Sequence, residues 1–315
     1  MQIYGPADDC PLSEFRPAVT IGVFDGVHRG HKTIIETLKQ TAKPLGVPSM
    51  AVTFATHPRQ ALGRAAPLSI CSLEKRLWLM AQAGLDAAWV LPFTLDFSLM
   101  SGKHFAEEYF LRRLNASAVV LGESASFGHN REGNAVTLAQ WGKEWGFPVV
   151  AVPPVAVNDS VVSSTAIRLA VQSGDLGRAE LFLGRKFSVE GTVVHGQGNG
   201  KHLGFPTLNL DPHHELRPPA GVYLTRTLID AVLRDSVTNI GRPPTEMEIE
   251  AGMTDFLIET HLLDFDGDLY GKTAEVFFYE KLRDVQRFPR TSGLMRKVGG
   301  DVLKARAWFA DNPEK

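Results

Sequence analysis

The first half of the chain alternates short apolar runs with stretches of helical periodicity. The apolar runs are rich in Val, Ile and Ala, and they lie at 18–23, 50–54, 87–91, 118–122 and 149–152. The helical patterns lie between them, at about 31–42, 73–83, 102–114 and 135–145. Gly84 and Gly146 stand where the glycines that end helices belong. Because strands and helices alternate, we predict a Rossmann-like α/β fold with a parallel sheet, whose ligands bind beyond the carboxyl ends of the strands.

The pattern changes near residue 184. Strand-like segments at 186–195, 221–228, 236–240, 256–263 and 273–281 are joined by turns of Gly, Pro, Asn and Asp rather than by helices. They predict an antiparallel β-barrel, followed by a C-terminal helix over about 292–309. A helical stretch at 164–183 would connect the two halves. We therefore expect two domains, residues 1–184 and 185–315, in agreement with the usual domain size of about 150 residues.

Composition and charge exclude several classes of partner. Lys and Arg total 33 and Asp and Glu total 35, so the net charge of −2 argues against a protein whose main partner is a nucleic acid. The cysteines are Cys10 and Cys71, which predict neither a disulfide framework nor a zinc cluster and fit a reducing cytoplasm. No apolar run approaches the roughly 20 residues of a membrane span. We expect a cytoplasmic protein, monomeric or weakly homo-oligomeric, whose partners are small molecules.

A glycine-rich turn with two histidines follows the first predicted strand. It reads Gly22-x-Phe24-Asp25-Gly26-x-His28-x-Gly30-His31. A strand, a glycine turn and a helix together form a phosphate site, because the N–H groups at a helix N-terminus point at the anion and the helix dipole favours negative charge. His28 and His31 can both donate to a phosphoryl group in its transition state. The alternatives are an ordinary turn with surface histidines and a zinc site, for which no third ligand stands at a recognisable spacing.

Two further segments of the first half carry polar residues where such folds bind ligands. His57 and Pro58 follow the second apolar run, so they belong to the same sheet edge as the histidine turn. The hydroxyl residues from Ser163 to Thr165, with Arg168 after them, open a helical stretch. Hydroxyl groups at such a place either cap the helix or hold phosphate oxygens, and the residues alone leave both alternatives open.

A glycine-rich segment near residue 200 carries the phosphate chemistry that we expect in the second half. The residues expected to contact phosphate are Gly198, Gly200, Lys201 and Gly204. The spacing is not that of a Walker P-loop, and a flexible hairpin loop is the alternative. Thr207 and Asn209 follow, and on an extended strand both side chains face the same side. With ATP oxygens they would complete the ligand shell of Mg²⁺.

Glu259 places a carboxylate inside the apolar segment at 256–263. A Glu in such a segment is rarely structural unless it is paired, which makes Glu259 a candidate general base. The alternative is an outward-facing Glu on an exposed face of a strand. The residues alone leave the choice between these two open.

The N-terminal motifs resemble the adenylyltransferase module of bacterial bifunctional riboflavin kinase/FAD synthetases. The resemblance lies in the histidine turn, then Thr53-Phe54-x-x-His57-Pro58, then Ser163-Ser164-Thr165-x-Ile167-Arg168. In that family the module joins the AMP of ATP to FMN and releases pyrophosphate. The resemblance implies an α/β nucleotidyltransferase fold of the HxGH superfamily, with His28 and His31 stabilising charge on the α-phosphoryl group. It also implies that Mg²⁺ bridges the ATP phosphates.

The resemblance implies functions for further residues of both modules. ATP and phosphate would be bound in the first module by Gly22, Phe24, Asp25, Gly26, Gly30, Ser163, Ser164, Thr165 and Arg168. The flavin would be bound by His57, Pro58, Phe127 and Asn239.

The second half resembles the flavokinase module of the same family. The matching motifs are Gly204-Phe205-Pro206-Thr207-x-Asn209, Gly221-Val222-Tyr223, Asn239-Ile240-Gly241, Glu259-x-His261-Leu262-Leu263-Asp264-Phe265 and Tyr270-Gly271. The resemblance implies that Thr207 and Asn209 hold Mg²⁺-ATP. Glu259 would take the proton from the riboflavin 5′-hydroxyl as it attacks the γ-phosphorus, and the products would be FMN and ADP.

Two stretches depart from the family pattern. Where the family has Asp or Asn, an aromatic residue and a later Asp, this chain has Ser124, Ala125 and Asn134. An aromatic ring lost beside a flavin removes about 1–3 kcal/mol of apolar burial, so we hypothesise weaker FMN binding. Val285 stands where Glu is common, and we expect an altered local ion pair there without loss of activity.

The resemblance covers nearly the whole chain and predicts a multifunctional, ATP-dependent flavin enzyme. Riboflavin would become FMN in residues 185–315, and FMN would become FAD in residues 1–184. One alternative is a riboflavin kinase with a degraded adenylyltransferase domain, which the three changed residues at 124, 125 and 134 would explain. The other is a flavin- or nucleotide-binding regulator without turnover.

Overall fold

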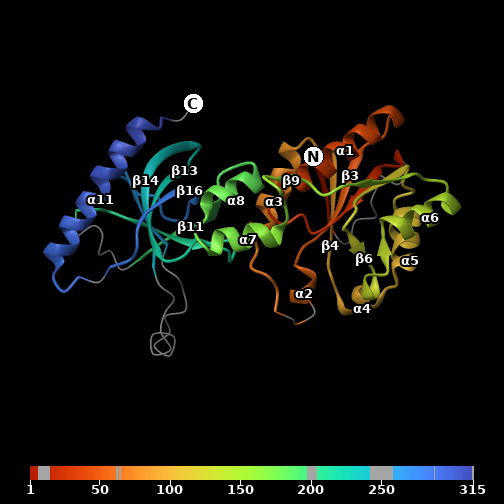
Figure 1. Ribbon diagram of the computed structural model, residues 1–315, viewed down its shortest axis with the longest axis horizontal. Helices are drawn as coiled ribbons and strands as arrows, with labels where there is room; N and C mark the ends of the chain where they lie inside the picture. The colour runs from red at the N-terminus through yellow and green to blue at the C-terminus, as the bar shows by residue number, and fades with distance from the viewer. Residues whose placement is uncertain are drawn as a thin grey trace. The chain divides into compact units, whose positions relative to one another are not determined.

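The computed structural model describes residues 1–5, 15–61, 63, 65–196, 204–241, 258–286 and 288–313. The chain forms two compact units, Met1–Ser164 and Thr165–Lys315 (Figure 1). The first unit contains a parallel sheet with helices, and the second contains a closed barrel and a long C-terminal helix. The two fold classes expected from the sequence are therefore confirmed.

The sheet of the first unit has six parallel strands in the order β1-β4-β3-β2-β5-β8. Their bounds are β1 Gln2–Tyr4, β2 Ala18–Ile21, β3 Ser49–Phe54, β4 Ala87–Leu91, β5 Ala118–Gly122 and β8 Val149–Val152. Five of them overlap the predicted apolar runs, whereas β1 is a three-residue strand at the sheet edge. The strand order reverses at β2, whose neighbours are β3 and β5. The histidine turn leaves the sheet at this reversal, which is where open α/β sheets bind ligands.

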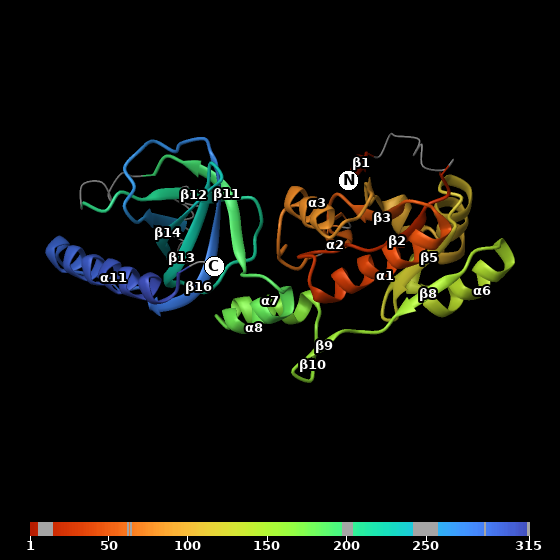
Figure 2. The ribbon, with the colours of Figure 1, turned by 90° about the horizontal axis from the view of Figure 1, so that it is seen from above.

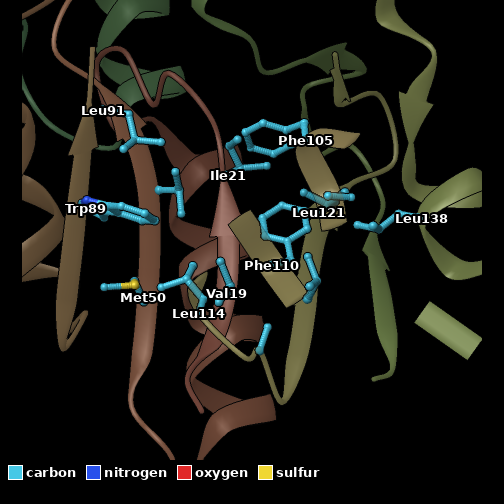
Figure 3. Close-up of a cluster of buried hydrophobic side chains, with 14 of the residues drawn as sticks. Val19, Ile21, Met50, Trp89, Leu91, Phe105, Phe110, Leu114, Leu121 and Leu138 are labelled. Atoms are coloured by element: carbon cyan, nitrogen blue, oxygen red, sulfur yellow. The ribbon is translucent and has the colours of Figure 1, made fainter. Parts of the chain in front are cut away.

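Helices cover both faces of this sheet. They are α1 (Arg29–Leu45), α2 (Pro58–Ala61), α3 (Leu73–Gln82), α4 (Leu95–Leu99), α5 (Gly102–Phe105) and α6 (Ala135–Trp145). Side chains alternate along each strand between two apolar clusters, because successive residues of a strand point to opposite faces. One cluster packs against α1 and α3. The other packs against the segment after α5 and against α6 (Figure 3).

The helical pattern at 102–114 becomes two different helices in the structure. After α5 the chain continues as a π-helix, η2 (Ala106–Arg113). Two ion pairs span five residues there, Arg112 with Glu107 at 2.7 Å and Arg113 with Glu108 at 2.8 Å. This spacing matches the i→i+5 repeat of a π-helix, whereas an α-helix brings residues four apart together. Two hairpins complete the unit, β6 (Ser126–Phe127) with β7 (Gly133–Asn134) and β9 (Ala156–Val157) with β10 (Ser160–Val161).

The barrel of the second unit closes in the order β11-β12-β15-β14-β13-β16. Its antiparallel strands are β11 Ser188–Val194, β12 Leu208–Pro212, β13 Gly221–Ile229, β14 Val232–Ile240, β15 Ile258–Leu262 and β16 Thr273–Arg283. Helices α7 (Ser164–Gln172) and α8 (Leu176–Leu183) precede it, and α11 (Thr291–Asp311) follows it. Figure 2 shows α11 running past the outer surface of the barrel. Apolar residues of β13, β14 and α11 pack together there.

The interior of the barrel contains a run of bonded hydroxyl groups among its apolar side chains. Thr260 Oγ1 lies 2.8 Å from Thr238 Oγ1, which lies 2.8 Å from Thr225 Oγ1. Ser236 Oγ lies 2.8 Å from Thr225 Oγ1 and 2.9 Å from Thr227 Oγ1. All five residues are fully buried. A buried hydroxyl group is tolerated when it is hydrogen-bonded, and here the hydroxyl groups of neighbouring strands are one another's hydrogen-bond partners.

Candidate active sites

His28 and His31 lie together where the turn after β2 enters α1. His28 caps the helix, and its Nδ1 accepts a hydrogen bond from the backbone N–H of His31 at 3.3 Å. The two rings are stacked, with centroids 3.6 Å apart and planes 16° apart. Because Nδ1 is an acceptor, the neutral His28 ring carries its hydrogen on Nε2. This turn therefore joins a helix N-terminus with a histidine N–H donor, as an anion site requires.

The backbone of the turn is strained. Phe24, Gly26 and Val27 all have positive φ, of 53°, 79° and 37°. This conformation is unusual for a β-branched residue and costs on the order of 1–3 kcal/mol per non-glycine residue. A Cβ on Gly26 would lie 2.9 Å from Ile70, and a Cβ on Gly30 would lie 3.2 Å from the His28 ring. The turn thus needs glycine at Gly26, and a side chain at Gly30 would press on the His28 ring.

Two of the predicted phosphate ligands help to hold this turn. The buried carboxylate of Asp25 accepts the N–H of Ile70 at 3.0 and 3.1 Å. The hydroxyl of Ser164, at the start of α7, donates to the backbone oxygen of Asp25 at 3.0 Å. Both side chains therefore form hydrogen bonds with the backbone of the protein, and these bonds stabilise the turn. Thr165 and Arg168, from the same motif, lie near the N-terminal end of α7.

Arg76 is a residue of this site that the motifs did not indicate. It lies on α3 with its guanidinium buried, and it donates to the backbone oxygens of Val23 at 2.7 Å and Phe54 at 2.6 Å. One side chain thus joins the segments that leave β2 and β3. The signal in the sequence was its place on the apolar face of the helix, between Leu73 and Met80.

Burial lowers the pKa of His31 well below its ordinary value of 6.5. Charge repulsion by His28, when that ring is protonated, and by Arg76 lowers the pKa further. His31 is therefore neutral at pH 7. Its Nδ1 is buried and has no hydrogen-bond partner among the described residues. Buried polar atoms are normally bonded, so an orphaned ring nitrogen beside a helix N-terminus fits a site that a ligand completes.

The predicted flavin residues of the first unit lie at two places. His57 follows β3, and its Nδ1 accepts the N–H of Arg59 at 3.2 Å, where Pro58 begins α2. Phe127 lies in the β6–β7 hairpin, with its ring 5.5 Å from the ring of Phe105. It packs so closely over Gly133 that a Cβ there would lie 2.5 Å from the ring. The structure thus joins Phe127 to an aromatic cluster on one face of the sheet.

Asn134 caps helix α6. Its Oδ1 accepts the N–H groups of Val136 at 2.9 Å and Thr137 at 3.0 Å, and Thr137 Oγ1 accepts the N–H of Asn134 at 3.0 Å. Asn and Asp cap helices about equally well, so this departure from the family pattern keeps the local structure. Ala125 is partly buried against the aromatic cluster beside Phe127. The change at 125 therefore removes apolar volume from the region that holds a predicted flavin residue.

In the second unit, a cavity of about 320 Å³ lies between the barrel and α11. Three of the predicted site residues line it, namely Thr207, Asn239 and Glu259. Asn239 Nδ2 donates to Glu259 Oε2 at 3.2 Å. Glu259 also pairs in register with Asn209 of β12, so Asn209, Glu259 and Asn239 cross three adjacent strands. Glu259 thus faces outward from the barrel, yet it faces a cavity that α11 covers.

The walls of this cavity are mostly apolar. Helix α11 contributes Leu294, Met295, Val298 and Val302, and the barrel contributes Phe205, Val222 and Val237. A buried ion pair ties the two walls together, because Arg283 Nε of β16 donates to Asp301 Oδ2 of α11 at 2.8 Å. Both residues line the cavity, and the sequence motifs indicated neither. Val285, the other departure from the family pattern, also lines it.

The oxygen donors near the cavity fit Mg²⁺ bound mainly by its substrate. Among the residues that the structure describes, no group of three or more His, Cys, Asp or Glu side chains is placed to hold a metal ion. Thr207 and Asn209 offer two neutral oxygens beside the Glu259 carboxylate. Mg²⁺ bound through few protein ligands and through substrate phosphates needs no more than this. The expected phosphate residues Gly198, Gly200 and Lys201 lie outside the described residues. Gly204, where the described chain resumes, has φ of 79°.

Gly196 allows the backbone to approach the side chain of Asn209, since a Cβ on Gly196 would overlap the Asn209 amide. We expect Gly196→Ala to displace Asn209. Because small misplacements in an active site are costly, the kcat of the phosphoryl transfer that the resemblance implies should then fall about tenfold. Gly300→Ala is the matched control, because no atom lies within 4 Å of a Cβ there. Steady-state kinetics of both variants check this. An unchanged kcat in Gly196→Ala would show that the position of Asn209 does not affect the reaction.

Comparisons with known proteins cover both units. The family model described as FAD synthetase matches residues 13–166, and the one described as riboflavin kinase matches residues 183–309. Two relatives are named bifunctional riboflavin kinase/FMN adenylyltransferase. The one from Haemophilus influenzae is 34% identical over 93% of this chain and 94% of its own. The one from Pseudomonas fluorescens is 36% identical over 94% of each chain.

A solved structure has the same fold over the full length. It is named a macrolide-efflux protein of Streptococcus pneumoniae, and it matches with a TM-score of 0.85 and 25% identity over 98% of this chain and 100% of its own. Within the described residues of our chain, no helix is both long enough and apolar enough to span a bilayer.

Proposed function

We infer that this chain, which belongs to the family of bifunctional riboflavin kinase/FMN adenylyltransferases, phosphorylates riboflavin to FMN and then adenylylates FMN to FAD. The observation that carries this conclusion is that both family models match the chain in order and together cover most of it. Each matched region also contains a site with suitable chemistry: stacked histidines at a helix N-terminus in one, and a carboxylate in a cavity between the barrel and α11 in the other.

In the barrel, we assign Glu259 as the general base and the cavity beside it as the riboflavin site. The riboflavin 5′-hydroxyl oxygen attacks the γ-phosphorus of ATP, the bond to the β,γ-bridging oxygen breaks, and ADP leaves. Glu259 accepts the hydroxyl proton, while its hydrogen bond from Asn239 holds the carboxylate in place. Thr207 and Asn209 would hold Mg²⁺, which neutralises phosphate charge when it is bound.

In the first unit, we assign His28 and His31 to the α-phosphate of ATP. A phosphate oxygen of FMN attacks the α-phosphorus, and pyrophosphate leaves. FMN phosphate is already an anion, so no general base is needed, and positioning and electrostatics supply the catalysis. His28 Nε2–H and the N-terminus of α1 stabilise the charge that develops. The remaining predicted residues, from Gly22 to Gly30 and from Ser163 to Arg168, would bind the nucleotide, while His57, Pro58 and Phe127 would bind the flavin.

Several further properties belong to this proposal. We propose Mg²⁺ as the metal ion and the cytoplasm as the location. The substrates are small molecules, and neither a nucleic acid nor a membrane is a partner. The chain is a monomer or a weak homo-oligomer. We place the domain boundary at residues 184/185, close to the start of the riboflavin kinase match at residue 183.

The product sequence tests the proposal. Purified protein is incubated with riboflavin, ATP and Mg²⁺, and the flavins are separated over time. We expect FMN first and FAD later, with no product when EDTA replaces Mg²⁺. FMN alone, with added FMN left unconverted, would identify a kinase with an inactive adenylyltransferase unit. Bound flavin without any product would identify a regulator.

A further inference from the structure

Arg76 occupies a position that the proposed adenylyl transfer does not yet explain. Its guanidinium lies behind the histidine turn and donates to the backbone oxygens of Val23 and Phe54. Val23 leads into the strained turn, and Phe54 ends β3 just before His57. One side chain therefore connects the two segments that carry the predicted catalytic and flavin residues.

A charged group is an expensive way to satisfy two carbonyl oxygens. Burying a guanidinium is unfavourable unless its surroundings compensate the charge, and a neutral amide would leave no charge to compensate. Burial indeed lowers the pKa of Arg76, while Cys71, Asp25 and Glu74 raise it. Arginine keeps its proton in proteins, so a fixed positive charge remains close enough to His31 to act on it. The substrates of adenylyl transfer are polyanions, for which such a charge is favourable.

We propose that Arg76 is a positioning residue for adenylyl transfer, which ties the start of the histidine turn to the end of β3 through two carbonyl oxygens and places a permanent positive charge near His31. This rests on the proposed function of the first unit. Arg76 does not reach the reacting atoms itself. It acts through the backbone that carries His28 and His31.

The proposal predicts how His31 titrates. The groups that repel a proton on His31 are Arg76 and, when it is protonated, His28. The groups that act on the charge of Arg76 are Cys71, Asp25 and Glu74. Removing the Arg76 charge removes one of the causes that hold the pKa of His31 down. The pKa of His31 therefore rises towards 6.5 in Arg76→Gln, although burial still holds it below that value.

Two substitutions distinguish the effect of the Arg76 charge from the effect of its two hydrogen bonds. Arg76→Gln removes the charge, whereas Arg76→Lys keeps it but cannot reproduce the fork that reaches both carbonyl oxygens. We expect kcat for FAD formation from FMN to fall at least about tenfold in both, with riboflavin phosphorylation unchanged in the same preparations. Histidine-selective NMR is expected to show a raised His31 midpoint in Arg76→Gln and a near-normal one in Arg76→Lys. Arg112→Gln, at an exposed arginine of the same unit, is the matched control.

The outcomes are decisive. Wild-type kcat in Arg76→Lys, or an unmoved His31 midpoint in Arg76→Gln, overturns the proposal. If Arg76→Gln does not fold, Arg76→Lys decides, with its melting temperature and its phosphorylation rate as evidence of an intact chain. If the wild-type protein itself forms no FAD, the proposed function fails, whereas the His31 titration still tests the placement of Arg76.

Discussion

Glu259→Gln will lower kcat for riboflavin phosphorylation by about a hundredfold or more, while FAD formation from FMN continues at the wild-type rate. The amide keeps the size of the side chain but cannot accept the hydroxyl proton, and general-base catalysis contributes about this factor. Glu259 lines the cavity and is held by Asn239, so little rearrangement accompanies the change. The measurement is ADP release with saturating riboflavin and ATP, followed across pH.

The control for this prediction is Glu280→Gln, which removes a carboxylate from β16 of the same barrel away from the Glu259 cavity. We expect its kcat to match the wild type. The KM for riboflavin is expected to change less than kcat in Glu259→Gln, because a base acts in the transition state rather than in binding. A nearly normal kcat would remove the assignment of Glu259.

His28→Asn will abolish most FAD formation and leave FMN formation intact. Asparagine is a good helix-capping residue, so its side chain replaces Nδ1 as the acceptor for the His31 N–H. The substitution therefore removes the Nε2–H donor and the ring stack without removing the cap. Losing one donor to a developing charge costs about 10²–10³ in kcat. The assay is conversion of FMN and ATP to FAD and pyrophosphate.

His104→Asn is the control for this substitution, because His104 is an exposed histidine of the same unit. It is expected to leave both activities unchanged. The riboflavin kinase activity of His28→Asn serves as an internal check, because the substitution lies outside the unit that contains the barrel. A kcat for FAD formation within about threefold of wild type would show that His28 supplies no donor of consequence.

The strands of the first unit could be predicted closely, since parallel strands buried on both faces are continuous apolar runs. Three of the predicted runs, at 87–91, 118–122 and 149–152, coincide with β4, β5 and β8. Strand β1 was not predicted, because three residues at a sheet edge are too few to show a periodic pattern. Strand β12 was not among the predicted strands. The sequence did predict an extended chain there, with the side chains of Thr207 and Asn209 on the same side.

The candidate sites could be predicted in their motif residues but not in their supports. Local spacing indicated His28, His31 and Glu259 as candidates, because each belongs to a short segment. Arg76 and Asp301 act on partners 53 and 18 residues away, which no local pattern connects. Glu259 illustrates this limit. The sequence offered a general base or a Glu on an exposed strand face, and neither interpretation included the cover that α11 gives to that face.

The hydroxyl groups inside the barrel also determine where Glu259 and Asn239 stand. Each site residue is the chain neighbour of a bonded hydroxyl residue, Glu259 of Thr260 and Asn239 of Thr238. Since side chains alternate along a strand, a slip by one residue would send the Glu259 carboxylate inside and expose Thr260. The polar ladder would then lose its partners, at a cost for each unpaired group. The bonded hydroxyl groups inside the barrel thus favour one register of β14 with β15. That register also fixes where Glu259 and Asn239 lie on the outer face of the barrel.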